Sequence, residues 1–342
     1  MAEHILIIRL SAIGDIVMAS CLAQGIRQQH PDATISWVVQ AGYEGLLQAN
    51  PYLDEVIIWP RKEWQSLWSK RKFVVLFREI RTFVRGLRQR GFTLAIDAQG
   101  LLKSGVFAFL SGAQTRIGLD SREGSAKLMT QVYHSPHSCN MGSEYRFLLK
   151  EIGAAARSAG MDVAVTGDDR AASSTILYQD SVNRPFVVFC PFSTREQKNW
   201  TTAHWQQLAK SIGEQLACDC VILGCSTDTD VALTMTAAGN LFDLTGKTTL
   251  RQAAALIKQA KALVGVDTGL THIGVVSEIP TVALFGSTRP YLHTDSAVTK
   301  VIYHDLPCAP CKRRPVCDGA YSCMREISAD EVMTELQRVL VP

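Results

Sequence analysis

Charged and hydroxyl side chains collect in four turns, each of which directly follows a short apolar run. The first turn has the sequence Arg-Leu-Ser-Ala-Ile-Gly-Asp and ends at Asp15. A carboxylate at a helix N-terminus interacts favourably with the helix dipole and caps the helix. A carboxylate that faces a cleft is instead able to act as a general base. The spacing of Asp15 fits both roles equally. The turn has neither a G-x-G-x-x-G fingerprint nor a Walker lysine motif, so it supports neither NAD nor P-loop chemistry.

The second and third turns add cations and hydroxyls. Asp97 ends an apolar run and is either a second carboxylate or an organiser of its loop, and Lys103 suits an anionic ligand. The third turn, which follows the apolar run 186–189, carries Ser193, Thr194 and Lys198. Phosphate oxygens favour such donors, although an ordinary hydrophilic loop has a similar composition.

The fourth turn spans Gly265 to His272 and includes Asp267. Gly269 lets the backbone approach a ligand closely, and the helix that it opens points free N–H groups outward, which makes a ready anion site. Thr268 adds a hydroxyl. A lone histidine in a first helical turn is more often a capping or core residue, but this polar setting favours a functional role for His272.

Apolar runs alternate with amphipathic stretches in both halves of the chain. This alternation predicts an α/β protein with two doubly wound parallel sheets, and ligands bind at the carboxyl ends of the strands in such sheets. The predicted strands are 4–9, 35–39, 56–59, 94–97, 186–189, 220–223, 262–266 and 281–285. The predicted helices are 15–29, one from about 102, 202–216, 250–260, 269–277 and 326–340.

Length and composition set the broad class. The 342 residues are 47% hydrophobic and 20% charged, which favours about two globular domains and excludes disordered, collagenous and disulfide-stapled proteins. No apolar run approaches the roughly 18 residues that span a bilayer. The N-terminus has no signal-peptide layout. We therefore expect a soluble, cytoplasmic chain.

Positive charge is concentrated in one segment. Residues 1–160 hold 19 Lys or Arg against 13 Asp or Glu, and residues 61–90 alone hold ten against two. This segment is either a solvated helix face or a surface for an anionic partner such as a phosphorylated glycolipid or membrane headgroups. It carries no nucleic-acid-binding motif, so we do not expect a nucleic-acid partner.

Four of the ten cysteines form a late cluster, Cys308-x2-Cys311-x5-Cys317-x5-Cys323. The first pair has zinc-knuckle spacing, whereas the second pair is more widely spaced than usual. In a metal site of this kind, His304 would be able to replace one of the cysteines as a ligand. A structural metal, a redox-labile disulfide pair and free thiols all fit the pattern.

Together these stretches resemble the bacterial lipopolysaccharide heptosyltransferases, glycosyltransferase family 9. The resemblance covers nearly the whole chain. The Asp-Ala-Gln-Gly-Leu-x-Lys-Ser stretch is most similar to heptosyltransferase I, and the Cys-x2-Cys tail to heptosyltransferase II. The matching stretches are Ile8–Asp15, Ile96–Ser104, Ser193–Trp200, Val266–His272 and Leu284–Thr288.

The resemblance implies a GT-B fold, in which two Rossmann-like domains face a central cleft. It implies an acceptor-binding domain at 1–160, a linker at 161–184, a nucleotide-sugar-binding domain at 185–325, and a C-terminal helix at 326–342 that packs back toward the N-terminal domain. It further implies an inverting enzyme that moves heptose from ADP-L-glycero-D-manno-heptose to the Kdo or inner core of lipopolysaccharide. Such an enzyme is peripheral on the inner face of the inner membrane. No catalytic cofactor is implied, and we expect a monomer.

By residue match, Asp15 resembles the catalytic base. The positive charge of Arg61, Lys62 and Lys103 makes them candidates for acceptor contacts. Residues that resemble the donor contacts are Ser193, Thr194, Lys198, Asp267, Thr268, Gly269 and His272. Two other functions stay open: a GT-B transferase with another nucleotide sugar or a later core acceptor, and a non-catalytic two-lobed sugar-binding protein.

Overall fold

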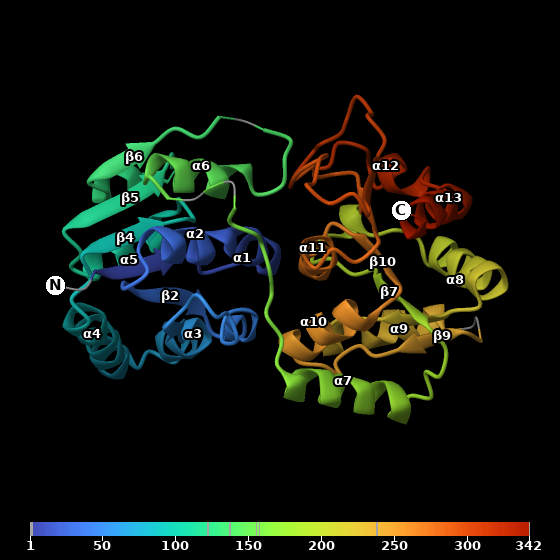
Figure 1. Cartoon of the computed structure of the whole chain (residues 1–342), viewed down its shortest axis with the longest axis horizontal. Coiled ribbons are helices and arrows are strands. Elements are labelled where there is room, and N and C mark those ends of the chain that lie inside the picture. Colours follow the sequence, from blue (N-terminus) through green and yellow to red (C-terminus); the bar gives the residue numbers. More distant parts are fainter. Residues whose placement is uncertain are drawn as a thin grey trace. The chain divides into compact units, whose positions relative to one another are not determined.

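A computed structural model describes residues 3–121, 123–136, 138–154, 156, 158–236 and 239–341. The chain divides into two compact units. The first comprises Met1–Ser138 and Gly142–Ala164, and the second comprises Cys139–Met141 and Val165–Pro342 (Figure 1).

The first unit is built on a six-stranded sheet whose strands are all parallel. Its order is β3-β2-β1-β4-β5-β6. The central strand β1 is the apolar run predicted from the sequence, and its last four residues are fully buried. The strands are β1 (His4–Ile8), β2 (Thr34–Gln40), β3 (Glu55–Trp59), β4 (Leu94–Asp97), β5 (Thr115–Leu119) and β6 (Gln131–Tyr133).

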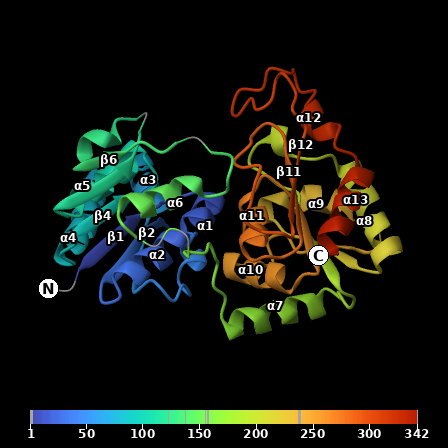
Figure 2. The ribbon, with the colours of Figure 1, turned by 45° about the horizontal axis from the view of Figure 1, so that its top comes forward.

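Helices cover both faces of this sheet (Figure 2). Across the sheet, the step from β1 to β2 goes toward one edge, and the step from β3 to β4 goes toward the other edge. Because each crossover is right-handed, the helices of these two connections lie on opposite faces of the sheet. The helix predicted at 15–29 is broken at Ser20 into α1 and α2, and the Ser20 hydroxyl donates a hydrogen bond to the Val17 carbonyl. The helices are α1 (Ile13–Ala19), α2 (Cys21–Gln29), α3 (Arg61–Ser69), α4 (Phe73–Gln89), α5 (Leu102–Leu110) and α6 (Ser143–Glu151), with short 3-10 turns at Glu44–Leu46 and Ser125–Leu128.

The second unit repeats the same plan. Its sheet is also entirely parallel, with the order β12-β11-β10-β7-β8-β9. Read in chain order, both sheets have the 3-2-1-4-5-6 arrangement of a Rossmann fold, which confirms the predicted fold class. The strands are β7 (Phe186–Cys190), β8 (Asp219–Ile222), β9 (Leu241–Asp243), β10 (Ala262–Val266), β11 (Thr281–Phe285) and β12 (Thr299–Tyr303).

The helices of the second unit are α7 (Gly167–Gln179), α8 (Thr202–Leu216), α9 (Thr229–Met235), α10 (Leu250–Gln259), α11 (Gly269–Val276), α12 (Ser322–Arg325) and α13 (Ala329–Leu340), with 3-10 turns at Glu196–Lys198 and Ser226–Asp228. Among the described residues, no helix has both the length and the apolar character needed to cross a membrane.

One segment differs from the expected domain boundaries. The expected linker at 161–184 contains helix α7, which packs on α10, and the Ser173 hydroxyl donates to the Gln252 carbonyl at 3.0 Å. The expected packing of the C-terminal helix toward the first domain stays a prediction. Helix α13 packs on α8, β10, β11 and β12, because its buried residues Val332 and Leu336 belong to the core of the second unit.

In a sheet of this order, the ligand crevice lies where the strand order reverses, at the carboxyl ends of the first and fourth strands. In the first unit these are β1 and β4, and in the second they are β7 and β10. Two of the four polar turns follow β1 and β7, and the turns at Asp97 and at Gly265–His272 begin on the last residues of β4 and β10. Each unit therefore presents two of the turns at its own switch point.

Candidate active site

In the first unit, Asp15 is held at the start of α1 by two partners. Arg9 Nη2 lies 2.7 Å from Asp15 Oδ2, and the Ala12 N–H donates to the same oxygen at 3.0 Å. The Asp15 side chain nevertheless keeps 40% of its surface exposed. A fixed carboxylate with open surface is able to accept a proton from a bound hydroxyl.

Arg9 is itself anchored. Its side chain is mostly buried, its Nη1 donates to the Ala98 carbonyl at 3.1 Å, and its guanidinium lies 5.8 Å from the centroid of the Tyr145 ring. Burial lowers the pKa of Arg9, but its charged surroundings, including Asp15, outweigh burial and raise it overall. Arg9 is therefore a permanent cation that fixes the orientation of Asp15.

Glu144, at the start of α6, is a second carboxyl in this neighbourhood that the sequence did not reveal. Burial raises the pKa of Glu144, Arg9 opposes that shift, and the charge of Asp15 adds to it. A hydrophilic helix start such as Gly-Ser-Glu gave no signal of a site.

Asp97 organises its own loop. It is fully buried, and its Oδ1 accepts hydrogen bonds from the N–H groups of Gln99 and Gly100 at 3.0 and 3.1 Å. Burial raises the pKa of Asp97, and these hydrogen bonds offset that effect only in part. Of the two roles predicted for Asp97, the geometry favours loop organiser over second carboxylate.

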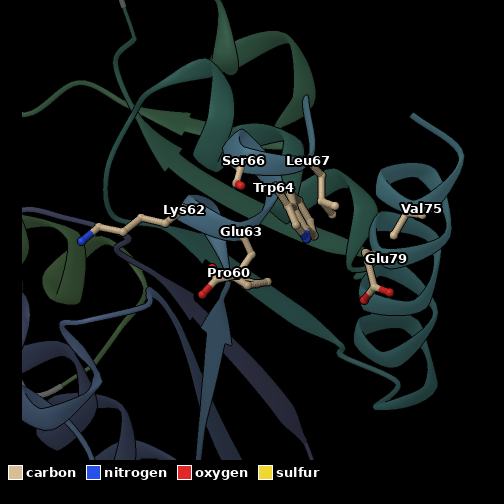
Figure 3. Close-up of a pocket in the computed structure, with 8 residues that line it drawn as sticks. All are labelled: Pro60, Lys62, Glu63, Trp64, Ser66, Leu67, Val75 and Glu79. Carbon is tan, nitrogen blue, oxygen red and sulfur yellow. The ribbon is translucent and has the colours of Figure 1, made fainter. Parts of the chain in front are cut away.

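The structure brings Arg61 and Lys103 near each other. Burial lowers the pKa of Lys103, and the positive charge of Arg61 lowers it further. Arg61 donates to Gln40 Oε1 at 3.0 Å and lies 5.9 Å from the Trp59 ring centroid. Lys62 lies on the exposed side of α3, where its side chain points away from α4 (Figure 3).

In the second unit, the third and fourth turns meet through an ion pair. Lys198 Nζ lies 2.6 Å from Asp267 Oδ2 and 3.4 Å from the Asp267 carbonyl oxygen. The Asp267 Oδ1 atom lies 3.3 Å from His272 Nε2, and Thr288 Oγ1 donates to Oδ2. Burial raises the pKa of Asp267, but His272 and Lys198 outweigh it and hold that pKa far below its usual range.

His272 has both ring nitrogens engaged within the protein. Its Nδ1 lies 2.7 Å from the Tyr291 hydroxyl, and Tyr291 is completely buried. This arrangement favours a positioning role for His272, in place of the direct donor contact expected from the sequence. Tyr291 was missed, and Thr288 lies in the matching stretch Leu284–Thr288 but was given no role.

Close packing at the end of β10 requires glycine. A Cβ atom on Gly265 would lie 2.1 Å from Thr271 Oγ1, which donates to the Val266 carbonyl at 2.7 Å. Gly269 then starts α11, with Thr268 in extended conformation at its N-cap and no side-chain cap hydrogen bond. The first N–H groups of α11 are the kind of donors that bind an anion.

Ser193 and Thr194 lie in the loop between β7 and α8 that also carries Lys198. The Ser193 N–H donates to Asn199 Oδ1 at 3.0 Å, which fixes the loop. Thr194 is exposed, and in the described part of the chain neither hydroxyl bonds another protein group. Both hydroxyls are therefore available to a ligand.

The four late cysteines have free thiols, and the tetrahedral metal set that their spacing allowed is not assembled. Cys323 is buried, and burial raises its pKa to about 11. Within the described ranges, no group of three or more His, Cys, Asp or Glu side chains is arranged to hold a metal ion, so His304 does not complete one either. The loop is tied to the site, because the Lys312 N–H donates to the Ser287 carbonyl and Gln197 Nε2 donates to the Lys312 carbonyl.

Two Rossmann-like units, with Asp15 at one switch point and the Lys198–Asp267 cluster at the other, are typical of the GT-B fold. The model of the family "Glycosyltransferase family 9 (heptosyltransferase)" matches residues 80–321, and the chain belongs to this family. The chain is therefore a glycosyltransferase, not a non-catalytic sugar-binding protein.

Similar proteins span nearly the whole chain. Lipopolysaccharide heptosyltransferase 1 of Pseudomonas aeruginosa is 26% identical over 317 residues, covering 91% of this chain and 86% of that protein. Lipopolysaccharide heptosyltransferase 2 of Escherichia coli is 24% identical over 357 residues, covering 98% of each.

Solved structures share the fold. A glycosyl transferase family 9 structure from Veillonella parvula has a TM-score of 0.85 at 19% identity, covering 99% of this chain and 97% of that one. Escherichia coli heptosyltransferase WaaC with ADP-2-deoxy-2-fluoro heptose has a TM-score of 0.75 at 20% identity, covering 98% and 99%.

Proposed function

We propose that this enzyme transfers heptose from ADP-L-glycero-D-manno-heptose to the Kdo of the lipopolysaccharide inner core, with inversion at the anomeric carbon. The observation that carries the proposal is the Arg9-held, exposed carboxylate of Asp15 at the switch point of the first sheet. The relatives named as lipopolysaccharide heptosyltransferases, and the solved structure with an ADP-heptose analogue, support the choice of donor.

Asp15 is the proposed general base. A sugar hydroxyl is a poor nucleophile near neutral pH, so Asp15 removes its proton as the oxygen attacks the anomeric carbon from the side opposite ADP. A single displacement through an oxocarbenium-like transition state inverts that carbon. Excluding water around the reacting groups limits hydrolysis of the donor.

The Lys198 cluster is the proposed site of the departing diphosphate. An ammonium group has three donors, and two of those of Lys198 point at Asp267, which leaves one for a phosphate oxygen. The N–H groups at Gly269 and the Thr268 hydroxyl add donors at the start of α11, and Ser193 and Thr194 add hydroxyls. These groups stabilise the charge that grows on the diphosphate, so the proposed reaction needs no metal ion. Asp267 and His272 act by holding Lys198 in place.

Arg61 and Lys103 are the proposed contacts for the anionic acceptor, with Lys62 at the margin. Carboxylates and phosphates of Kdo–lipid A match this positive charge. Since that acceptor is lipid-linked, we propose that the enzyme works at the inner, cytoplasmic face of the inner membrane. We also propose that it is a monomer.

The test is ADP release from ADP-heptose in the presence of defined acceptors, with product mass measured. We expect release that depends on Kdo-lipid A, and a fall of about 10²- to 10⁴-fold for Asp15→Asn with donor binding retained. Near-normal turnover of Asp15→Asn would remove it from the role of base.

The later-core acceptor of heptosyltransferase II is the second candidate, favoured by the resemblance of the Cys-x2-Cys tail and by the full-length match to that protein. A heptosylated acceptor in the same assay distinguishes the two. A panel of nucleotide sugars tests the donor, and turnover with another sugar but not ADP-heptose would contradict the proposal.

A further inference from the structure

The corner between α3 and α4, residues 68–78, turns large apolar side chains outward. The exposed fractions are 66% for Trp68, 50% for Phe73, 85% for Val74 and 66% for Phe77. Trp68 and Phe73 pack edge to face on each other, with ring centroids 5.2 Å apart. Scattered exposed apolar residues are ordinary, but four of this size within ten positions form a patch.

The side of these two helices that faces α5 packs on the core through aromatic contacts, and Trp64, Leu67, Val75 and Glu79 also line a pocket between α3 and α4 (Figure 3). Trp64 on α3 packs edge to face on Phe83 of α4 at 5.6 Å, and Phe83 packs on Phe107 of α5 at 5.7 Å. Leu76 and Leu87 are buried. Figure 3 shows Trp64 and Leu67 directed toward α4, on the side opposite to Lys62. The outward apolar residues are therefore additional to those that stabilise the fold.

Cations surround this patch. Lys70, Arg71 and Lys72 form the turn between the helices, and all three are exposed. Arg81 and Arg85 continue one exposed stripe of α4 from Val74, at helical spacing. None of these five cations has an ion-pair partner in the portion of the chain that the structure describes. The only acidic residues within 61–90 are Glu63 and Glu79.

An anionic lipid surface matches this combination. Aromatic side chains favour the headgroup level of a bilayer, and each Lys or Arg beside an anionic leaflet strengthens binding about fivefold. A nucleic acid would use the cations but leave Val74 and the outermost apolar surface unused. Helix α3 also leads from Arg61, at the carboxyl edge of the sheet, to the corner, a path of about 13 Å along the helix axis.

We propose that the α3–α4 corner docks the enzyme on an anionic phospholipid bilayer, with Trp68, Phe73, Val74 and Phe77 entering the headgroup layer and the surrounding cations contacting lipid phosphates. Docking would bring the Arg61 edge of the first unit close to a lipid-linked acceptor, and this benefit alone rests on the proposed function. The binding itself needs neither substrate.

The test is vesicle flotation of the full chain without substrates. The vesicles are an equal mixture of phosphatidylglycerol and phosphatidylethanolamine, and pure phosphatidylcholine vesicles serve for comparison. We expect binding to the anionic vesicles that weakens as salt rises, and weak binding to phosphatidylcholine. Trp68→Ser with Phe77→Ser should reduce partitioning at least about tenfold, and Arg81→Ser with Arg85→Ser about 25-fold.

Two matched variants in the second unit are the controls. Val231→Ser with Leu233→Ser removes apolar residues that are 51% and 58% exposed, and Lys210→Ser with Lys261→Ser removes two exposed cations. Both should bind vesicles like the wild type. Loss in the control variants equal to that in the corner variants, or equal wild-type binding to both kinds of vesicle, overturns the proposal. So does unchanged binding of both corner variants.

Activity separates this proposal from the proposed function. With an acceptor whose acyl chains have been removed, the corner variants should turn over at the wild-type rate, whereas with vesicle-embedded acceptor their rate should fall in step with partitioning. A wild type that floats but transfers no heptose contradicts only the proposed function. A wild type that transfers heptose but does not float contradicts only the docking surface.

Discussion

The ammonium group of Lys198 lies 2.6 Å from a carboxylate oxygen of Asp267, 69 positions away in the sequence. Both side chains are largely buried, and Asp267 also contacts His272 and accepts a hydrogen bond from Thr288. The pair joins the loop after β7 to the loop after β10. It therefore fixes the relative positions of these two loops at the switch point of the second sheet.

Replacing Lys198 by Met should weaken both stability and catalysis. Asp267 would keep its burial but lose its closest cation, and breaking a buried pair on one side costs about 3–5 kcal/mol. Urea unfolding measures this loss, and ADP release should fall by at least about 100-fold because the diphosphate loses a donor. Lys210→Met is the control, since Lys210 and Glu214 form an exposed pair at 3.9 Å. It should leave activity and stability close to those of the wild type.

Asp267 should also make stability depend on acid pH. Burial alone would raise its pKa, but His272 and Lys198 hold it well below the ordinary 3.8. The folded protein therefore keeps Asp267 ionised at a pH where the unfolded chain has already bound a proton. The stabilisation is complete above about pH 5 and is lost as pH falls below about 4 toward the folded-state pKa.

Asp267→Asn removes this titration. The difference in unfolding free energy between the wild type and Asp267→Asn should shrink steadily as urea unfolding is repeated at lower pH. A difference that stays constant across the acid range would contradict the depressed pKa. His272 contacts the same carboxylate, so the loss of that contact in Asp267→Asn is part of the measured difference.

The sequence was sufficient to predict the central strands of both sheets and the turns at their switch points, but not β5, β6, β9 and β12. Runs such as 4–9 and 262–266 are apolar enough to be central strands, and central strands have polar turns at their carboxyl ends. Asp15, Lys198 and Asp267 could be found for that reason. The missed strands are short or only half-buried: β6 and β9 have three residues each, and β5 and β12 have few buried residues.

Partners that are distant in sequence were also beyond prediction. The Lys198–Asp267 pair and the contact of His272 with Tyr291 depend on how neighbouring loops fold over one another. Helix α7 was expected to be a linker because its Ala-, Ser- and Asp-rich sequence has little apolar periodicity. It is stabilised by polar contacts with α10, including Arg251 with Asp169 at 3.1 Å.

Gly265→Ala should disrupt the donor half of the site. The new Cβ would lie 2.1 Å from Thr271 Oγ1 and 2.9 Å from the Cys190 Cβ, so the start of α11 must shift. We expect a loss of about 1–3 kcal/mol in unfolding free energy and weaker ADP binding by calorimetry. Gly167→Ala is the matched control, because a Cβ there meets nothing within 4 Å in the first turn of α7. It should preserve ADP binding and stabilise the protein slightly.

Arg9 should act on catalysis only through Asp15. Arg9→Met fills a similar volume but removes the ion pair at 2.7 Å, so the carboxylate loses its fixed orientation and kcat should fall about 10- to 100-fold. Binding of the donor, whose proposed contacts all lie in the second unit, should not change, and Arg9→Lys should recover part of the rate.

Steady-state ADP release of the double variant Arg9→Met with Asp15→Asn is the decisive measurement. If Arg9 only positions Asp15, the double variant is no slower than Asp15→Asn alone, because the two residues act as one unit. Multiplied losses would instead show that Arg9 contacts the acceptor independently.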